Sequence, residues 1–486
     1  MAAGDEETIV VGAGIVGLTT AVLLAEAGRR VALITAEPVG GGSSGRSAGI
    51  ISRLHGTAYR RLRRETALRN VVAHRAANDA GFAWLDRFLE RRAVPHERRD
   101  ALLVALDASA TRRIDDEHLA AIRAGLPVQK VQRPALPFPA FGALRLPGQI
   151  LVDPRALLGE LAIEARELGV VLYEHERVLD VDVRLLGDVR VLTDRAERSA
   201  AQVVLATGTP ILERGLYLLK TQPYRIMALR GSGVDAALPL ITAVGPAGST
   251  TVATDREGTA TVLGGAHPVG VGGPESRYAA ALERFAGEHL PGFRGEDRWS
   301  GQDYRPFNPI AFAGVLPGSA GRVRFATGFD GWGLTHGAAA AIRITRELLG
   351  LPRPEWATAI AHRVTRPISG AAGLSADARA AARGVGGVLR LTPADRRLLT
   401  EGHGVTHRTD RGVVATSRVD GMVRSVSGWC TRFGGVLVWN DAELSWDCPV
   451  CGSRFGPGGD VLEGGARTAL PPIEDPTDWD GASRGV

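Results

Sequence analysis

Short apolar runs alternate with helical patterns in the first part of the chain. Residues 8–11, TIVV, are apolar and mostly β-branched, which is typical of a short buried strand. In the segment LTTAVLLAEAG, Leu18, Val22 and Ala25 recur at helical spacing and Gly28 ends the pattern. A second apolar run, RRVALIT, follows directly. The pattern predicts a strand–turn–helix–strand unit of a Rossmann-like α/β domain.

The turn in this unit reads GAGIVG, residues 12–17. Gly12 permits a tight turn, Gly14 lets the backbone approach a pyrophosphate, and Gly17 lets helix and strand pack closely. The helix N-terminus, which contains Ile15 and Val16, stabilises phosphate charge. Such a motif also occurs in purely structural turns, but its place between a strand and a helix indicates dinucleotide binding.

The ribose contact departs from the usual pattern. The acidic residue that ends the second strand in dinucleotide-binding units is expected near position 35, which is Thr35, and Glu37 lies two residues further on. Both residues are candidates for the ribose contact.

A second small-residue loop, GGGSSGRSAGII at 40–51, distinguishes FAD from NAD. An extended flavin nucleotide needs backbone amides near its pyrophosphate and ring, whereas a nicotinamide enzyme has no need of this loop. Two later strands, within 200–208 and 323–345, also end in glycine turns, and the second leads into an alanine-rich helix. The N-terminus of that helix can stabilise negative charge on reduced flavin. Ordinary strand–helix turns are the alternative interpretation.

The residues assigned to non-covalent FAD are those of the loops and turns described above. They are Gly12, Gly14, Ile15, Val16, Gly17, Thr35, Glu37, Gly42, Ser43, Ser44, Ser47, Ala48, Gly49, Thr207, Gly208, Gly331, Trp332, Gly333, Leu334 and Thr335.

The pattern changes after residue 350. Residues 351–395 combine prolines with small residues and predict a linker with short helices. Short strands and turns then indicate a small all-β domain over 396–472, and 473–486 is expected to be a disordered tail. The three cysteines of the chain, Cys430, Cys448 and Cys451, all lie in the all-β part. Clustered cysteines of this kind suggest a metal site in a cytoplasmic protein rather than a disulfide framework.

Composition adds few functional constraints. The net charge is +5, but arginines are interleaved with acidic residues and form no basic stripe, so we do not expect nucleic acid as a partner. The acidic N-terminus does not resemble a secretory signal. No apolar run approaches the 18 residues or so of a membrane span, so none is expected.

These motifs resemble the FAD-dependent D-amino-acid oxidase/glycine oxidase superfamily. The stretches SRLHGTAYRRL, WSGQDYRPF and GFDGWGLTHG more narrowly resemble the subgroup fused to a C-terminal Rieske-type domain. The resemblance implies a discontinuous FAD-binding domain over 1–80, 150–217 and 320–350. A mixed-sheet substrate domain over 81–149 and 218–319 is implied as well. It also implies that the backbone near Val178 meets the adenine.

Substrate contacts follow from the same resemblance. Arg305, in an Arg-Pro pair, matches the arginine that grips a substrate carboxylate in amino-acid oxidases, and guanidinium geometry suits that task. A surface ion pair is the alternative. Tyr304 and Tyr224 are candidate hydroxyl partners or packing residues. The resemblance places His55 close to the flavin, where a structural histidine is the alternative.

Rieske domains bind a 2Fe–2S cluster through two cysteines and two histidines. Here the two histidine positions are Arg432 and Cys451, so a genuine Rieske centre is excluded. Three hypotheses for the thiols stay open: an iron–sulfur cluster, zinc, or no metal in a vestigial domain.

We therefore predict an FAD-dependent oxidoreductase that takes a hydride from an amine, amino acid or related carboxylate-bearing small molecule. Oxygen is the expected acceptor if the cysteine site is empty, and an electron carrier if a cluster persists. The alternative is a non-catalytic FAD-binding protein whose C-terminal domain is a structural or interaction module.

Overall fold

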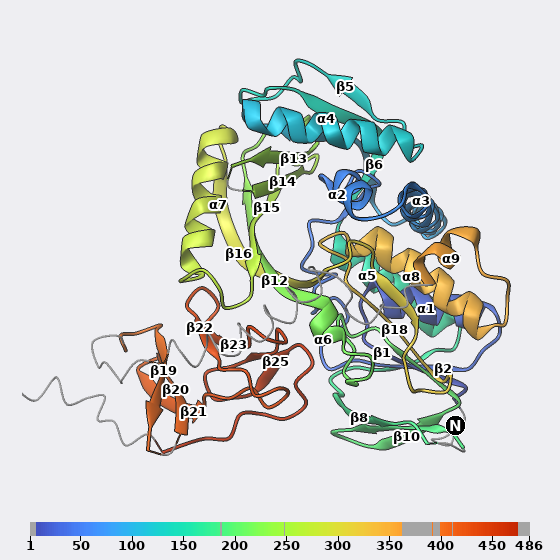
Figure 1. The fold of residues 1–486 in the computed structure, drawn as a ribbon, viewed down its shortest axis with the longest axis vertical. Helices are drawn as coiled ribbons and strands as arrows, with labels where there is room; N and C mark the ends of the chain where they lie inside the picture. The colour runs from blue at the N-terminus through green and yellow to red at the C-terminus, as the bar shows by residue number, and fades with distance from the viewer. Residues whose placement is uncertain are drawn as a thin grey trace, which may run out of the picture.

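The computed structural model describes residues 6–184, 187–246, 248–361, 391, 399–410 and 412–474 (Figure 1). Within them, one sheet carries the glycine turns, a larger sheet lies beside it, and small sheets form the C-terminal part. The predicted linker over 351–395 falls mostly outside the described residues, and the predicted tail beyond residue 474 falls outside them entirely.

The first sheet has six strands in the order β17-β18-β11-β1-β2-β7, parallel except for β17. The strands are β1 (Thr8–Val11), β2 (Val31–Ile34), β7 (Val171–Tyr173), β11 (Gln202–Leu205), β17 (Phe312–Val315) and β18 (Val323–Thr327). A three-stranded antiparallel sheet accompanies it, made of β8 (Val178–Asp182), β9 (Val189–Thr193) and β10 (Glu197–Ala200).

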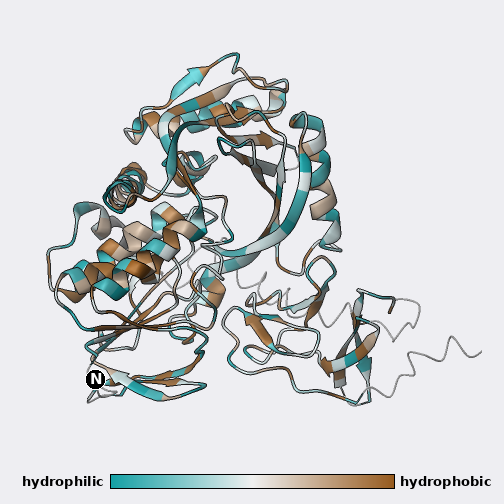
Figure 2. Cartoon of the chain, turned by 180° about the vertical axis from the view of Figure 1, so that it is seen from behind, coloured by the Kyte–Doolittle hydropathy of each residue, from teal (hydrophilic) through white to brown (hydrophobic). Residues whose placement is uncertain are grey.

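Helices cover the first sheet, and the most apolar of them lie innermost (Figure 2). They are α1 (Ile15–Glu26), α3 (Leu68–Arg91), α5 (Pro154–Glu167), α8 (Gly333–Leu348) and α9 (Glu355–Ala361). From Ile15 to Val22 every residue of α1 is buried, as expected for a helix that is apolar on all sides. Gly337 of α8 permits close contact with α1, because a Cβ there would lie 2.7 Å from the Ile15 side chain.

The second sheet has nine strands in a mixed arrangement. They are β3 (Ile50–Ile51), β4 (His96–Ala105), β5 (Gln129–Val131), β6 (Ala143–Val152), β12 (Thr221–Ser232), β13 (Leu240–Gly245), β14 (Gly248–Thr254), β15 (Ala260–Pro268) and β16 (Arg294–Pro306). The helices that accompany it are α2 (Ala58–Glu65), α4 (Ala108–Arg123) and α7 (Ser276–His289), and the short α6 (Tyr217–Lys220) precedes β12. The edge strand β16 pairs along its whole length with β12.

The described C-terminal part consists of strands and turns. One sheet contains β19 (Gly404–Thr409), β20 (Gly412–Val419) and β21 (Met422–Ser427). The other contains β22 (Val438–Asn440), β23 (Ser445–Asp447), β24 (Arg454–Phe455) and β25 (Val461–Glu463). Trp446 and Phe455 form a buried core together with the three cysteines.

The C-terminal part docks on β12 and β16 (Figure 1). Arg225 of β12 makes a buried ion pair with Asp447 of β23 at 2.7 Å. Gln302 of β16 donates a 2.6 Å hydrogen bond to the carbonyl of Gly452. Breaking one partner of a buried pair leaves an uncompensated charge, so these contacts fix how the two parts meet.

The predicted fold class, an α/β Rossmann-like domain with a mixed-sheet partner, is confirmed, and the described residues of the C-terminal part are all-β. The predicted domain boundaries stay predictions. The boundary at residue 80 falls inside α3, which packs on α8, and the one at 150 falls inside β6.

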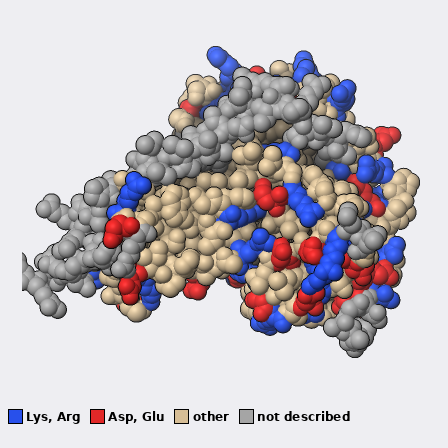
Figure 3. Space-filling model, turned by 60° about the horizontal axis from the view of Figure 1, so that its bottom comes forward, with Lys and Arg blue, Asp and Glu red and all other residues tan. Residues whose placement is uncertain are grey.

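Acidic and basic side chains are interspersed on the face seen in Figure 3. Among the described residues, no helix combines the length and the apolar character that crossing a membrane requires.

Gly17 provides a test of the first turn. A Cβ at this position would lie 1.8 Å from the carbonyl oxygen of Gly12, so Gly17→Ala must push α1 away from β1. We expect Gly17→Ala to lower the free energy of unfolding by about 3 kcal/mol or more and to reduce bound FAD. Gly159→Ala in α5 is the matched control, since a Cβ there meets no atom within 4 Å. Chemical denaturation and flavin absorbance measure both effects, and equal stability of the two variants would contradict this account.

Candidate functional site

A cavity of about 1060 Å³ lies where the first sheet, the edge of the second sheet and the C-terminal part meet. The turn after β1, the loop 40–48, the turn after β11 and the turn before α8 all line it. From the other side, Leu462, Glu463, Gly464 and Ala466 of the C-terminal part contribute to its wall. Segments far apart in the sequence therefore form one enclosure.

Glycine permits close packing of the chain at the first turn. Gly12 has φ of +106°, and a Cβ there would lie 2.5 Å from the Ala206 carbonyl oxygen. A Cβ at Gly14 would lie 3.1 Å from Ser44 Oγ, which accepts a 3.2 Å hydrogen bond from the backbone N–H of Ile15. The N-terminus of α1 and the second loop thus converge, which is the arrangement that binds a pyrophosphate.

Most residues assigned to FAD line this cavity. They are Gly12, Gly14, Ile15, Val16, Thr35, Glu37, Gly42, Ser43, Ser44, Ser47, Ala48, Val178, Thr207, Gly208, Gly331, Trp332, Gly333 and Leu334. Three others support the wall from behind. Gly17 lies against Gly12, Gly49 (φ +70°) lies against the Val152 carbonyl, and Thr335 Oγ1 lies 3.2 Å from His55 Nε2.

The two ribose candidates differ in their surroundings. Thr35 is buried, and its hydroxyl donates a 3.0 Å hydrogen bond to the carbonyl oxygen of Glu37. The Glu37 side chain is exposed at the cavity wall. The Glu37 carboxylate is therefore more accessible to a ligand in the cavity than the Thr35 hydroxyl.

Arg305 lies in the cavity wall within a chain of alternating charges. Its Nε donates to Asp330 Oδ1 at 2.7 Å, and Arg61 Nη1 donates to Asp330 Oδ2 at 2.6 Å. The guanidinium carbon lies 4.7 Å from the ring centroid of Tyr224, within cation–π range. Arg305 thus does form an ion pair, and the stacked guanidinium still faces the cavity.

Asp303 is an acidic residue of the cavity that the sequence interpretation did not select. It accepts hydrogen bonds from the backbone N–H groups of Gly331 at 2.6 Å and Tyr304 at 2.7 Å. Burial raises the pKa of Asp303 to about 6, although these two hydrogen bonds favour the charged form. The bond to Gly331 ties β16 to the turn that precedes α8.

The two predicted tyrosines have different partners. Tyr224 Oη lies 3.5 Å from Asp303 Oδ2, on the same side of the sheet as Arg305. The Tyr304 hydroxyl donates to the carbonyl of Cys451 at 3.3 Å and lies 3.2 Å from Gln302 Nε2. Tyr304 therefore links the cavity wall to the cysteine segment.

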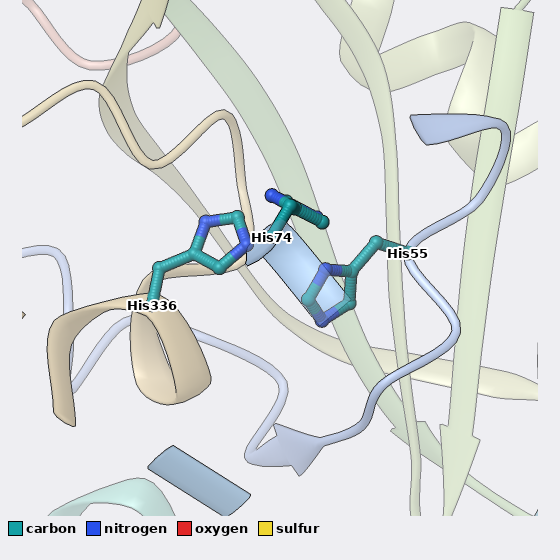
Figure 4. Close-up of side chains that lie close together, drawn as sticks. All are labelled: His55, His74 and His336. Carbon is teal, nitrogen blue, oxygen red and sulfur yellow. The ribbon is translucent and has the colours of Figure 1, made fainter. Parts of the chain in front are cut away.

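His55 and His74 of α3 are buried and lie in one group with the partly buried His336 of α8 (Figure 4). The His55 ring stacks on Trp332 with centroids 4.6 Å apart, and its Nε2 lies 2.6 Å from the Ser52 carbonyl. Burial lowers the pKa of His55 well below its ordinary value and that of His336 to about 4. Both rings are thus neutral near pH 7 and place no positive charge beside the turn before α8.

The three thiols lie together and are buried. Their sulfur atoms all lie within 4.8 Å of one another, and Cys430 Sγ and Cys451 Sγ are 3.7 Å apart. Arg432 points elsewhere: its Nη2 lies 2.5 Å from the Pro210 carbonyl and 3.3 Å from Glu213. A guanidinium lacks a lone pair for a metal, so the site offers thiols but no ligand from Arg432.

The cavity, its glycine turns and the parallel sheet define a dinucleotide-binding flavoprotein. The family model described as FAD dependent oxidoreductase (DAO) matches residues 7–347, and the chain belongs to this family. FAD is the cofactor of this family, and the N-terminus of α1 beside Ser44, in the cavity wall, suits its pyrophosphate.

A curated relative extends the comparison to the C-terminal part. The protein named putative Rieske 2Fe-2S iron-sulfur protein YhfW, from Bacillus subtilis (strain 168), is 24% identical over 487 residues, covering 96% of this chain and 93% of the relative. The predicted resemblance to an oxidoreductase with a Rieske-type domain is confirmed.

Solved structures show the same fold at lower identity. Glycine oxidase from Geobacillus kaustophilus matches with a TM-score of 0.61 at 17% identity, covering 72% of this chain and 96% of that chain. L-proline dehydrogenase from P. horikoshii matches with a TM-score of 0.60 at 17% identity, covering 72% of this chain and 95% of that chain.

The raised pKa of Asp303 has a consequence for stability. A carboxyl group whose pKa is about 6 in the folded state and near 3.9 when unfolded binds more protons in the folded state between these values. Its contribution to stability is therefore fully present below pH 4 and lost as the pH rises through 6. Between pH 4 and 7, the free energy of unfolding of the wild type should therefore fall by about 2 kcal/mol relative to that of the Asp303→Asn variant.

The measurement is denaturant unfolding of both proteins across this pH range. Asp297→Asn, at the exposed end of the same strand, is the control and should leave the pH dependence unchanged. A constant difference between wild type and Asp303→Asn would contradict the assigned burial of this carboxyl group.

Proposed function

We propose that the protein oxidises the C–N bond of an amine or amino acid that carries a carboxylate. The observation that supports this most is the placement of Arg305 and Asp303 on one side of β16, facing the turn before α8. A guanidinium suits a carboxylate and an ionised aspartate suits an ammonium group. The pair thus complements both ends of an amino acid.

In this proposal each group of residues has a separate role. Arg305, held by stacking on Tyr224 and by Asp330, binds the carboxylate through its terminal nitrogens. Asp303 orients the amino group and takes up a proton from it, for which a pKa near 6 is suitable. Leu462, Glu463, Gly464 and Ala466 of the C-terminal part form one wall of the cavity.

FAD, when bound, supplies the acceptor for the hydride that leaves the substrate carbon. The substrate loses two electrons and two protons in total, one of them within the hydride, and the C–N single bond becomes C=N. Hydrolysis of that bond gives a carbonyl product and the amine or ammonia. The named neighbours support this chemistry, since a glycine oxidase and a proline dehydrogenase share the fold.

Arg305→Ala tests the carboxylate contact. We expect KM for a carboxylate-bearing substrate to rise about 30-fold or more, because a charge-assisted contact of about 2 kcal/mol or more is lost. Bound FAD should be unchanged. Anaerobic bleaching of the flavin with a panel of amino acids, including glycine and proline, identifies a substrate, and steady-state kinetics then gives KM.

Arg298→Ala is the matched control, because Arg298 lies exposed on the same strand, next to Glu283. An unchanged KM in Arg305→Ala would remove the carboxylate role. A flavin that no amine or amino acid bleaches would remove the proposed activity and favour a non-catalytic FAD protein.

A further inference from the structure

The positions of the three sulfur atoms suit one metal ion better than two. In a tetrahedral site with metal–sulfur bonds of about 2.3 Å, neighbouring sulfurs lie about 3.8 Å apart. Cys430 Sγ and Cys451 Sγ are 3.7 Å apart, and Cys448 Sγ lies within 4.8 Å of both. In a Rieske cluster two ligands bind one iron and the other two bind the second iron. The four ligand atoms therefore do not surround a single point.

The local sequence supports the same conclusion. Cys448-Pro449-Val450-Cys451 has the two-residue spacing of single-ion sites that bind through cysteine. The turn is closed by a 2.8 Å hydrogen bond from the Gly452 N–H to the Cys448 carbonyl, and Gly452 has φ of +73°. This turn places the sulfur atoms of Cys448 and Cys451 within 4.8 Å of each other.

The ligand set departs from that of a Rieske cluster at both histidine positions. Cys451 occupies one, and Arg432 at the other is held by Pro210 and Glu213 with its guanidinium over the Phe433 ring. Within the described residues, no histidine belongs to the group of donors around the three thiols. The residues present therefore do not fit a cluster with two imidazole ligands.

A hydroxyl lies beside one of the three thiols. Ser453 is fully buried, and its Oγ lies 3.2 Å from Cys451 Sγ. In a tetrahedral zinc site with one oxygen ligand, the oxygen–sulfur distance is about 3.5 Å. Ser453 Oγ also accepts a 2.9 Å hydrogen bond from the Ala466 N–H, which holds it beside Cys451.

We propose that Cys430, Cys448, Cys451 and Ser453 bind a single thiophilic divalent ion of the Zn²⁺ type, without inorganic sulfide. Zinc has no redox chemistry, so the ion stabilises the segment that contacts Tyr304 and does not relay electrons. Electrons then leave the flavin directly to an acceptor that enters the cavity. This inference stands independently of the proposed substrate.

The composition of the full-length protein provides the first test. Protein purified from cells grown with added zinc is assayed for FAD, zinc, iron and acid-labile sulfide. We expect about one zinc per chain, with iron and sulfide far below stoichiometric amounts. Two irons with two sulfides per chain, or the absence of any bound metal, would overturn the proposal.

Cobalt provides a spectroscopic test on the unaltered chain. After removal of the ion with a chelator, Co²⁺ should bind once per chain and give thiolate-to-cobalt charge-transfer bands together with the visible bands of a tetrahedral site. Cys451→Ser should weaken the charge-transfer bands by about a third, since one of three thiolates is lost. Thr431→Ala, beside Cys430 but bonded to the Thr468 carbonyl, is the control and should match wild type.

A double variant tests whether the residues at positions 432 and 451 determine which metal centre the C-terminal part binds. Arg432→His with Cys451→His restores two cysteines and two histidines, and anaerobic reconstitution with iron and sulfide should then give a Rieske-type spectrum. Reconstitution of a 2Fe–2S cluster in the wild type under the same conditions would overturn the proposal. Flavin bleaching by substrate, measured on the same samples, reports separately on the proposed function.

Discussion

The antiparallel pairing of β12 with β16 determines which residues of these two strands face the candidate site. In its register Tyr224 faces Asp303 and Arg225 faces Gln302. Opposite residues of an antiparallel pair share a side and successive residues alternate. Asp303 and Tyr224 therefore face the turn before α8, while Arg225 and Gln302 reach the C-terminal part. A slip by one residue would exchange these two sets, so the cavity and the docking surface depend on the same register.

The buried pair between Arg225 and Asp447 adds specificity to that docking. Burying both charges is costly, and their attraction offsets the cost only when further hydrogen bonds complete the network. Asn440 and Ser445 each donate to Asp447, and Ser300 Oγ lies 3.0 Å from Arg225 Nη1. A different orientation of the C-terminal part would leave these groups unpaired, which disfavours it strongly.

The sequence predicts some parts of the site well because their chemistry is local. The glycines at 12, 14 and 17 define a turn between adjacent elements, and the structure places all of them at the first turn. Asp330 and Arg61 escape prediction because their roles arise from contacts across more than 240 positions of the chain. Asp330 adopts φ of +51°, a backbone conformation that a sequence pattern does not reveal.

The docking of the C-terminal part also explains how its ligands can change while the cavity persists. Gln302 and Tyr304 bind the backbone carbonyls of Gly452 and Cys451, and backbone groups remain when a side chain is replaced. Leu462 and Ala466 line the cavity from a segment outside the thiol turn. Side-chain changes at positions 432 and 451 therefore leave these backbone contacts and this part of the cavity wall in place.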